Sequence, residues 1–478
     1  MIPLTMRIKK TLPLLVAAVV AMPAILNAQT SDRLPAASNA SGQLRDSMPA
    51  TWTLEPQYTQ TTPTSDGWWN RFSDPTLQAL MQRAVDNNFN VLAAAQRIEQ
   101  ARQTIRQTKA GYYPSFNIQA GWDKVQTSGL NDVVHVHTER DSYWHGDIGM
   151  NWEIDLFGRI RRQLKADKAG YKASLADYDA VLVSLCSDLA STYVDLRVAQ
   201  QQLLLTEGTA SEQDSLLNMA KLRYEAGLVS ELDVVTARIM IKQTRATIPS
   251  LRAQIAADIN AIAILVGEYP ERLAALSAPA QLPPGAIVAT GIPADLLRRR
   301  PDVVQAEQQL ARCAAQVGVA KADFLPMLSL AGSVGTSAYE AKNLFTKDSF
   351  TWQITPTLSW TIFDGMGRSA RIAEAKAQMM ESYDAYNMAV MTAVQEVQNA
   401  LTSLSAAAEE EHMYVDLNKE YASSLRLNIQ RYREGLVDFS DVADAQIQKL
   451  DGLKEVVAAR GNVLNGMVTL YTALGGGW

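Results

Sequence analysis

The chain has 478 residues and a formal net charge of −6, with 44 basic and 50 acidic residues. This acidic balance argues against a nucleic-acid partner, whose phosphates would require a basic face. No nucleophile–base signature and no Gly-rich phosphate loop occurs, so the sequence does not favour an enzyme. Cys186 and Cys313 lie in different segments and predict small buried thiols rather than a disulfide framework, although a bridge between them stays open.

Residues 1–28 predict a secretory signal peptide. Arg7, Lys9 and Lys10 precede the apolar run Leu12–Leu26, and a small residue follows at Ala28. The run is short for a membrane-spanning helix, and an uncleaved anchor is the alternative. We therefore predict export. No later segment shows the roughly 18 uncharged apolar residues that a spanning helix needs.

Residues 29–67 are rich in Ser, Thr, Pro, Ala and Gln without a clear period, and they predict an extended arm. Helical patterning follows from Asp74 to Thr108. Asp74 is the expected N-cap and Pro75 the first helical residue. The helix is predicted to stop at Gly111.

Alternation with a period of two replaces the helical pattern after this point. One strand begins at Ser115, and a second covers roughly Tyr143–Ile154. A polar loop is predicted to hold three of the chain's four histidines, His135, His137 and His145. A metal site is one interpretation of these imidazoles. Solvated side chains are the favoured one, because the spacing is not that of a fixed ligand set.

Two further strands are predicted near residues 324–363, one with Leu328, Leu330 and Val334, the other with Trp352, Ile354, Pro356, Leu358, Trp360 and Ile362. Strands of about nine to eleven residues match a tilted membrane strand. Aromatic residues near strand ends are typical of an interfacial belt. They are Trp122, Tyr143, Trp144, Trp152, Tyr339, Trp352 and Trp360.

A very long helix follows each pair of strands. Apolar residues at spacings of three, four and seven begin at Ile160 and at Ile372, which is typical of a coiled-coil seam. About 60 helical residues would span ~90 Å, more than a single globular core. Pro249 is predicted to kink the helix that returns from the first of these.

The most informative feature is a duplicated motif. Arg223–Val234 reads RYEAGLVSELDV and Arg431–Val442 reads RYREGLVDFSDV, with seven of twelve positions identical. The offset of 208 residues (435 against 227) also carries Trp152 onto Trp360. A duplicated unit of this length indicates two structural repeats. We predict a first repeat at 68–285, with a β-hairpin near 112–154 and an α-hairpin tip near 227, and a second at 286–478, with a β-hairpin near 324–363 and a tip near 435.

Four strands per chain cannot close a membrane barrel, because the smallest known closed forms use eight. Open strand edges are not tolerated in lipid. Subunits must therefore pool strands, eight with two chains or twelve with three. The predicted fold class is mainly α with membrane β. An exported protein that self-associates through a shared barrel and long coiled coils has the geometry of a conduit. A structural or adhesive coiled-coil trimer without conduction is the alternative.

With these motifs the chain resembles the TolC family of outer-membrane efflux and secretion channels. Ile154–Arg159 and Ile362–Arg368 resemble the family's junctions between barrel and helices, and Leu296–Val303 resembles the opening of its second repeat. The resemblance implies a homotrimer, with a twelve-stranded β-barrel in the outer membrane that continues into a periplasmic α-helical barrel. The chain lacks the lipidated N-terminal cysteine of many members.

The resemblance also implies a function and partners. The implied role is the exit duct of a tripartite efflux pump, which passively conducts small molecules such as drugs and toxic compounds to the outside. The implied partners are a periplasmic adaptor (membrane fusion) protein, an inner-membrane transporter of the RND type and outer-membrane lipids. No cofactor and no metal is implied.

Four residues match the family's gate. Asp441 and Asp444 match acidic rings at the periplasmic constriction, where stacked carboxylates favour cations. A helix-start residue and a solvated residue are the alternatives. Tyr432 matches a tyrosine that bonds to an aspartate of the neighbouring chain, and Asp233 matches that aspartate. Packing in the seam is the alternative for Tyr432.

The residues of the two turns are predicted to contact the adaptor. Glycine permits the reversal of the chain, and an exposed apolar pair is a surface that a partner tip could cover. Packing within the chain is the alternative. The residues are Gly227, Leu228, Val229, Gly435, Leu436 and Val437.

Overall fold

The computed structural model describes residues 59–60, 68–126, 140–283, 288–289 and 299–476. The compact unit Met48–Trp478 contains all of them. The predicted signal peptide and most of the predicted arm lie outside the described residues, as do His135 and His137. Within the arm, β1 (Thr59–Gln60) pairs in parallel with β4 (Val288–Ala289).

Two helices, α4 (Pro75–Asn87) and α5 (Phe89–Ala110), replace the single helix expected from Asp74 to Thr108. The Asp74 cap is confirmed, since its Oδ1 accepts from the backbone N–H of Thr76 at 2.8 Å. The chain turns at Asn88, whose ψ of 126° is extended. Its side chain caps α5 and donates to the carbonyl oxygen of Leu265 at 2.9 Å. The break is therefore a second capped helix start, which apolar periodicity alone does not reveal.

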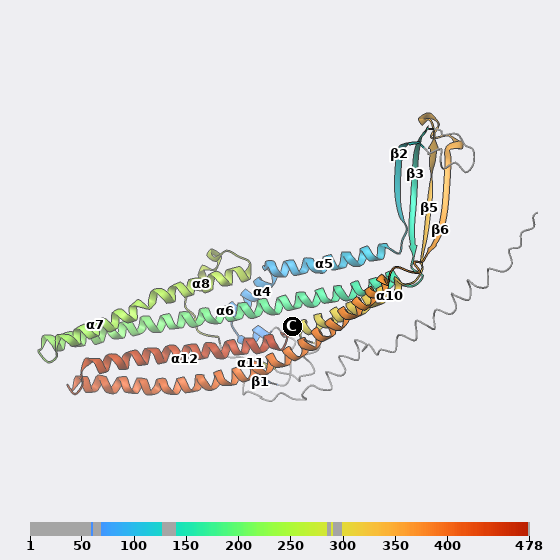
Figure 1. Cartoon of the computed structure of the whole chain (residues 1–478). Coiled ribbons are helices and arrows are strands. Elements are labelled where there is room, and N and C mark those ends of the chain that lie inside the picture. Colours follow the sequence, from blue (N-terminus) through green and yellow to red (C-terminus); the bar gives the residue numbers. More distant parts are fainter. Residues whose placement is uncertain (1–58, 61–67, 127–139, 284–287, 290–298, 477–478) are drawn as a thin grey trace, which may run out of the picture. The chain divides into compact units, whose positions relative to one another are not determined.

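The four longer strands form one antiparallel sheet in the order β2-β3-β5-β6, with β2 (Ser115–Gln126), β3 (Arg140–Ile154), β5 (Met327–Ala338) and β6 (Phe350–Ser359) (Figure 1). His145 lies in β3, so its expected place in the loop is wrong. Trp360 and Ile362 lie beyond the end of β6. Trp360 donates its Nε1–H to the carbonyl oxygen of Phe324 at 3.2 Å, and this bond holds it at the junction with the helices.

The register gives the sheet one apolar and one polar face. Directly paired residues form an apolar row across all four strands: Ile118, Ile148, Val334 and Trp352. The next row, on the opposite face, is polar or small: Gln119, Asp147, Gly335 and Thr351. The alternation predicted from the sequence is therefore confirmed, and it places hydrophobic side chains together on one side of the sheet.

Two helices of 67 residues each follow the strands, α6 (Arg159–Glu225) and α11 (Gly367–Arg433). The chain returns from them through α7 (Glu231–Ala246) and α8 (Ile248–Val266) in the first repeat and through α12 (Phe439–Ala473) in the second. A 22-residue helix, α10 (Pro301–Ala322), precedes β5 as α5 precedes β2. Elements of the two repeats thus correspond in order, and the helices α5 and α10, and α6 and α11, correspond in length.

Pro249 interrupts the helix that returns from the first tip, where the sequence predicted a kink. It lies in the first turn of α8, after α7 has ended at Ala246. A proline is tolerated in a first turn because the N–H that it lacks has no partner within the helix there. The second repeat has Val457 at the corresponding position and a continuous α12.

The main core lies where α4, α6, α8, α11 and α12 pack together. Tyr193, Leu196 and Leu404 are fully buried in it. Cys186 and Cys313 are buried and free, which excludes the bridge that the sequence left open.

One helical stretch among the described residues, Glu231–Val266, is long and apolar enough to cross a membrane. The sequence had predicted no such segment. The stretch is weak evidence for a span, because it contains Arg252 and Asp258 and because a helix that packs within a protein passes the same test.

Two glycines with nearly the same backbone angle allow a prediction about stability. Gly267 (φ +74°) ends α8, and an added Cβ would lie 2.5 Å from the carbonyl oxygen of Asn87. Gly435 (φ +75°) has open space around it. The left-handed conformation costs alanine roughly 1–2 kcal/mol at either site. We expect Gly267→Ala to lower the thermal unfolding midpoint clearly more than Gly435→Ala, measured by circular dichroism. Equal decreases would contradict the close packing of Gly267.

Candidate functional site

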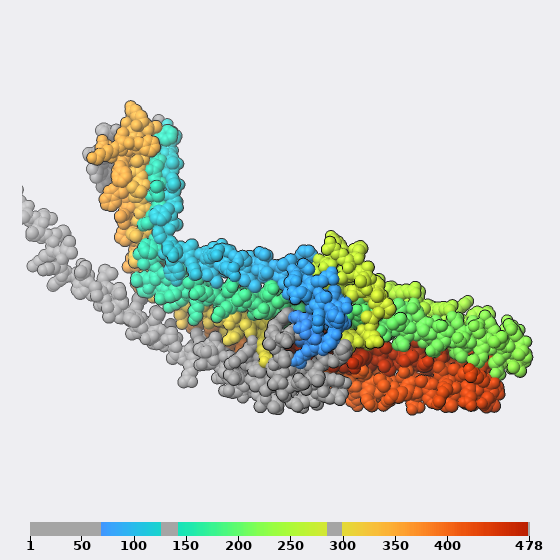
Figure 2. Space-filling model, turned by 180° about the vertical axis from the view of Figure 1, so that it is seen from behind, coloured from blue at the N-terminus to red at the C-terminus, as the bar shows by residue number. Residues whose placement is uncertain are grey.

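The turns that join α6 to α7 and α11 to α12 lie next to each other at one end of the helices (Figures 1 and 2). Each begins with the same hydrogen-bond pattern. The Gly227 N–H donates to the Tyr224 carbonyl at 2.8 Å, and the Leu228 N–H donates to the Arg223 carbonyl at 2.9 Å. Gly435 and Leu436 repeat these bonds at 3.0 and 2.9 Å. Both glycines are left-handed, so the sequence-based reason for glycine at these positions is confirmed.

The helix ends enclose a tip cluster of buried residues: Leu216, Ala220, Val234, Ala237, Met240, Leu425, Tyr432, Phe439, Val442, Ala443 and Ala445. Leu228 and Leu436 stay outside it, 67% and 63% exposed. Val229 and Val437 pack against the cluster. The expected exposed pair is therefore wrong for the valines, and each turn presents one exposed leucine.

Asp441 and Asp444 project from the exposed side of the first turns of α12. Their neighbours Val442, Ala443 and Ala445 are buried in the tip cluster. Residues three apart in a helix lie on the same side. In the part of the chain that the structure describes, neither carboxylate has a hydrogen bond or an ion pair from a side chain. Both charges are therefore free to act on something outside the single chain.

Tyr432 and Asp233 meet within one chain, whereas the family resemblance implied neighbouring chains. The Tyr432 hydroxyl donates to Asp233 Oδ2 at 3.1 Å. The tyrosine ring is 2% exposed and packs edge-on against Phe439, with 5.4 Å between ring centroids. Packing and hydrogen bonding, which the sequence left as alternatives, thus occur together. The bond ties the start of α7 to the end of α11.

Arg223 is a third member of this contact, for which no role was predicted from the sequence. Its guanidinium lies 5.0 Å from the centroid of the Tyr432 ring, within cation–π range. Its Nη1 donates to the carbonyl oxygen of Arg433 at 2.7 Å. Both copies of the duplicated motif begin with an arginine, and this repetition was the sequence signal that could have revealed its role. Arg223, Tyr432 and Asp233 together form what we call the tip lock.

Removal of the Tyr432 hydroxyl group, with the aromatic ring kept, tests the tip lock. Burial, reinforced by the Asp233 carboxylate, raises the pKa of Tyr432 to about 12. Because the pKa is raised in the folded state, the hydrogen bond contributes fully to stability below about pH 10, the ordinary pKa of tyrosine. This contribution is lost as the pH rises through the raised pKa. We expect Tyr432→Phe to remove about 0.5–1.5 kcal/mol of tip stability and, in the channel that the family resemblance implies, to increase the closed-state current in planar bilayers.

The increase should be the same from about pH 6 to pH 9, because the phenol stays protonated throughout that range. Tyr269→Phe, at a 78% exposed position far along the chain, is the control. A current in Tyr432→Phe that matches this control would contradict a role for the tip lock in closure.

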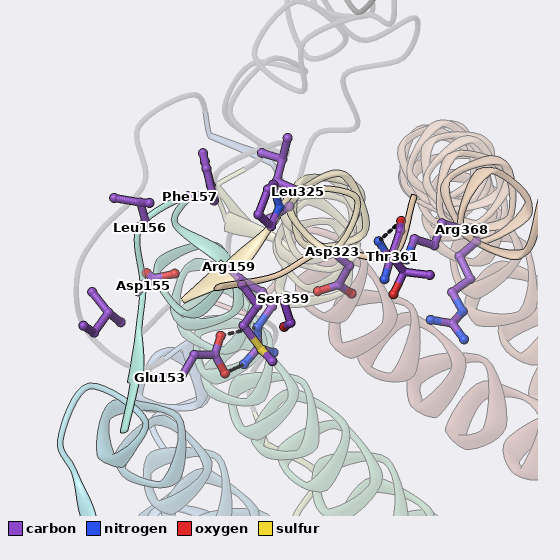
Figure 3. Close-up of a pocket in the computed structure, with 15 residues that line it drawn as sticks. Glu153, Asp155, Leu156, Phe157, Arg159, Asp323, Leu325, Ser359, Thr361 and Arg368 are labelled. Carbon is purple, nitrogen blue, oxygen red and sulfur yellow. Dashed lines mark hydrogen bonds and ion pairs between the residues drawn. The ribbon is translucent and has the colours of Figure 1, made fainter. Parts of the chain in front are cut away.

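The other polar site lies where strands pass into helices, around a pocket of about 380 Å³ (Figure 3). Glu153 at the end of β3 binds Arg159 at the start of α6 through two bonds, of 2.9 and 2.7 Å. Asp155 accepts from the N–H groups of Ile160 and Arg161, each at 3.0 Å. In the second repeat Asp364 accepts from the Arg368 N–H at 3.0 Å. These contacts fix the direction in which each long helix leaves the sheet.

The tryptophans of the two repeats perform the same task at this junction. Trp152 donates its Nε1–H to the carbonyl oxygen of Tyr112 at 3.0 Å, as Trp360 does to Phe324. Each bond connects the end of a strand to the residues just after a 22-residue helix. The junction is thus built twice, with one ion pair in each repeat, Glu153 with Arg159 and Asp364 with Arg368.

Histidines do not form a metal site within the described residues. His145 Nδ1 lies 3.4 Å from Asp123 Oδ2 on the polar face of the sheet. His412 lies on α11, 3.6 Å from Asp416.

Comparisons with known proteins match this architecture. The sequence profile described as "Outer membrane efflux protein" matches residues 80–268 and 292–476. The solvent efflux pump outer membrane protein SrpC of Pseudomonas putida is 31% identical over 408 residues, which are 85% of this chain and 86% of SrpC. Nodulation protein T of Rhizobium leguminosarum bv. trifolii is 29% identical over 381 residues, 79% of this chain and 81% of that protein.

Solved structures of outer-membrane channels have a similar fold. The outer-membrane channel OprN superposes with a TM-score of 0.84 at 30% identity, over 90% of this chain and 97% of OprN. The CmeC outer membrane channel of Campylobacter jejuni has a TM-score of 0.80 at 23% identity, over 90% of this chain and 91% of that chain, and this likeness supports the fold alone.

Proposed function

Because the chain belongs to the outer membrane efflux protein family and is an outer-membrane efflux duct, we propose that it forms the passive, tip-gated exit of a tripartite pump. The observation that carries this is the combination of an open sheet with one apolar face and two long α-hairpins that end in a charged tip. The sheet suits lipid on one side and water on the other. The helices extend the route away from the membrane.

We propose that three copies assemble around one axis. The sheet has free edges at β2 and β6, and lipid does not tolerate unpaired strand edges. Pairing β6 of one copy with β2 of the next leaves no edge, and three copies of the four-stranded sheet give a twelve-stranded barrel. The long helices then form an α-helical barrel in the periplasm.

The gate is proposed to lie at the tip. In a closed ring, Asp441 and Asp444 of every copy would surround the axis, and their negative potential would favour cations. The tip lock would hold each copy's two hairpins together in this closed state, because it connects α6, α7 and α11.

We propose that a periplasmic adaptor (membrane fusion) protein docks on the two turns. Leu228 and Leu436 are exposed apolar side chains on left-handed glycine turns, and a partner tip can bury them. The adaptor would connect the duct to an inner-membrane transporter of the RND type. The names of relatives such as SrpC, a solvent efflux pump protein, suggest small apolar molecules as cargo.

The proposed trimer predicts the mass of the purified protein. We expect the protein purified in mild detergent to contain three chains by native mass spectrometry, because neither the sheet edges nor the helix seams are satisfied in one copy. A single chain that stays monodisperse in the same detergent would contradict the proposed barrel.

A further inference from the structure

We propose that Tyr112, Asp155 and Arg161 bind the headgroup of one phospholipid molecule where the strands pass into the helices. The proposed ligand is zwitterionic, with a phosphate beside an ammonium group, as in phosphatidylethanolamine. This lipid site rests on the proposed barrel, whose apolar face lies against lipid, and goes beyond it by assigning a ligand to named residues of the first repeat.

Arg161 carries a charge that the chain itself does not pair. The residue is exposed, and its side chain makes no hydrogen bond or ion pair with the residues that the structure describes. Its guanidinium lies over the turn that precedes α6, with Nη2 2.7 Å from the position that a Cβ on Gly158 would take. Leu156 and Phe157 of this turn are 57% and 38% exposed. A cation and exposed apolar side chains thus lie side by side.

The start of α6 directs Arg161 away from the polar face of the sheet. Arg159 binds Glu153, and Glu153 lies in a polar row with Ser329 and Thr357. Arg161 follows Arg159 by two residues in α6, so it projects roughly 200° around the helix axis from it. Arg161 therefore points to the side of the apolar face, which lies against lipid in the proposed barrel.

Tyr112 and Asp155 complete the lipid site. Trp152 lies on the apolar face, where it pairs with Leu330. Its Nε1–H donates to the carbonyl oxygen of Tyr112, which places Tyr112 at the end of this face. The charges of Asp155 and Arg161 both act on the Tyr112 phenol, so the three side chains lie near one another. Tryptophan and tyrosine are also the residues enriched at the level of lipid headgroups.

The three side chains match both charges of a zwitterionic headgroup. A guanidinium binds a phosphate through two parallel hydrogen bonds, and the phenol hydroxyl can donate a third. The Asp155 oxygens accept from the N–H groups of Ile160 and Arg161, each at 3.0 Å, and each oxygen keeps a lone pair for an ammonium group. One cation and one anion make the lipid site neutral, which favours a zwitterionic lipid over an anionic one.

The second repeat does not have the same set of side chains. Phe324 takes the place of Tyr112, since the junction tryptophan of each repeat donates to the carbonyl oxygen of one of these two residues. Phenylalanine has no hydroxyl to donate. Ser369 is the third residue of α11 as Arg161 is the third of α6, and its hydroxyl donates to a carbonyl of its own chain at 2.9 Å. We therefore expect one bound lipid per chain.

Native mass spectrometry with defined lipids tests the site. Delipidated protein in mild detergent is mixed with phosphatidylethanolamine, with phosphatidylglycerol of the same acyl chains, or with inorganic phosphate. We expect the unsubstituted protein to retain one phosphatidylethanolamine molecule per chain. Arg161→Gln should weaken this binding about tenfold or more, because a charge-assisted contact to the phosphate is lost, and Tyr112→Phe should weaken it less. Arg371→Gln is the control, since Arg371 is exposed but lines the junction pocket with Glu153.

The outcomes separate the lipid site from the proposed function. Weaker binding in Arg161→Gln with unchanged binding in Arg371→Gln supports the site. Binding of phosphatidylethanolamine by Arg161→Gln at the unsubstituted level overturns it and leaves the duct intact. Equal or tighter binding of phosphatidylglycerol, or phosphate ions retained in place of lipid, overturns the zwitterionic headgroup as the ligand. Lipid binding is measured without current, so a protein that binds the lipid but does not conduct would overturn the duct alone.

Discussion

Replacing Asp441 and Asp444 together with alanine is expected to reduce cation selectivity strongly and to change the closed conductance, while trimer assembly is unaffected. Two exposed carboxylates from every copy would meet at the narrowest part of the closed duct, and charges there dominate the local potential. Neither side chain belongs to the tip cluster, so their removal leaves the packing in place. The measurement is the reversal potential in a salt gradient across a planar bilayer.

A matched variant controls for the loss of charge itself. Glu409 and Glu410 are exposed acidic residues on α11, more than 20 residues before its end at the tip. Their double alanine variant removes the same number of negative charges, but at a distance from the tip. We expect it to keep the selectivity of the unsubstituted protein. Unchanged selectivity in the Asp441/Asp444 variant would mean that these residues do not line the duct.

Valine in place of both turn glycines, Gly227 and Gly435, is expected to abolish most efflux without preventing insertion. Both glycines are left-handed, with φ of +69° and +75°, and this conformation costs a side-chain-bearing residue roughly 1–2 kcal/mol. The strain would displace Leu228 and Leu436, the proposed contacts of the adaptor. The readout is drug sensitivity of cells that depend on this duct.

Gly208→Val supplies the control for this double variant. Gly208 lies within α6, and the space around it is open, so valine there should leave efflux unchanged. The amount of trimer in the outer-membrane fraction is measured in parallel. Loss of that trimer in the Gly227/Gly435 variant would show that the turns are needed for folding and not for docking.

The order of elements could be predicted from the sequence because duplication and periodicity are local signals. The two tip motifs, the 67-residue helices and the apolar face of the sheet each follow from spacing within one segment. Asn88 shows the limit of such signals. Helical periodicity continues across it, whereas in the structure Asn88 is extended, caps α5 and donates to the Leu265 carbonyl.

The contacts of the tip could be predicted only in part. The family resemblance implied that Tyr432 and Asp233 of neighbouring chains are partners, whereas the structure joins them within one chain. The sequence-based prediction also assigned Leu228 and Val229 the same role, whereas the turn directs the valine toward the tip cluster and the leucine outward. Both distinctions depend on how the two hairpins pack against each other.

The most direct test of a tip-gated duct is the current that the purified, unsubstituted protein carries across a planar lipid bilayer. A trimer closed at an acidic tip should give small, stable currents that are selective for cations. A membrane-bound protein that carries no current, or large currents without selectivity, would contradict a duct that is closed at Asp441 and Asp444.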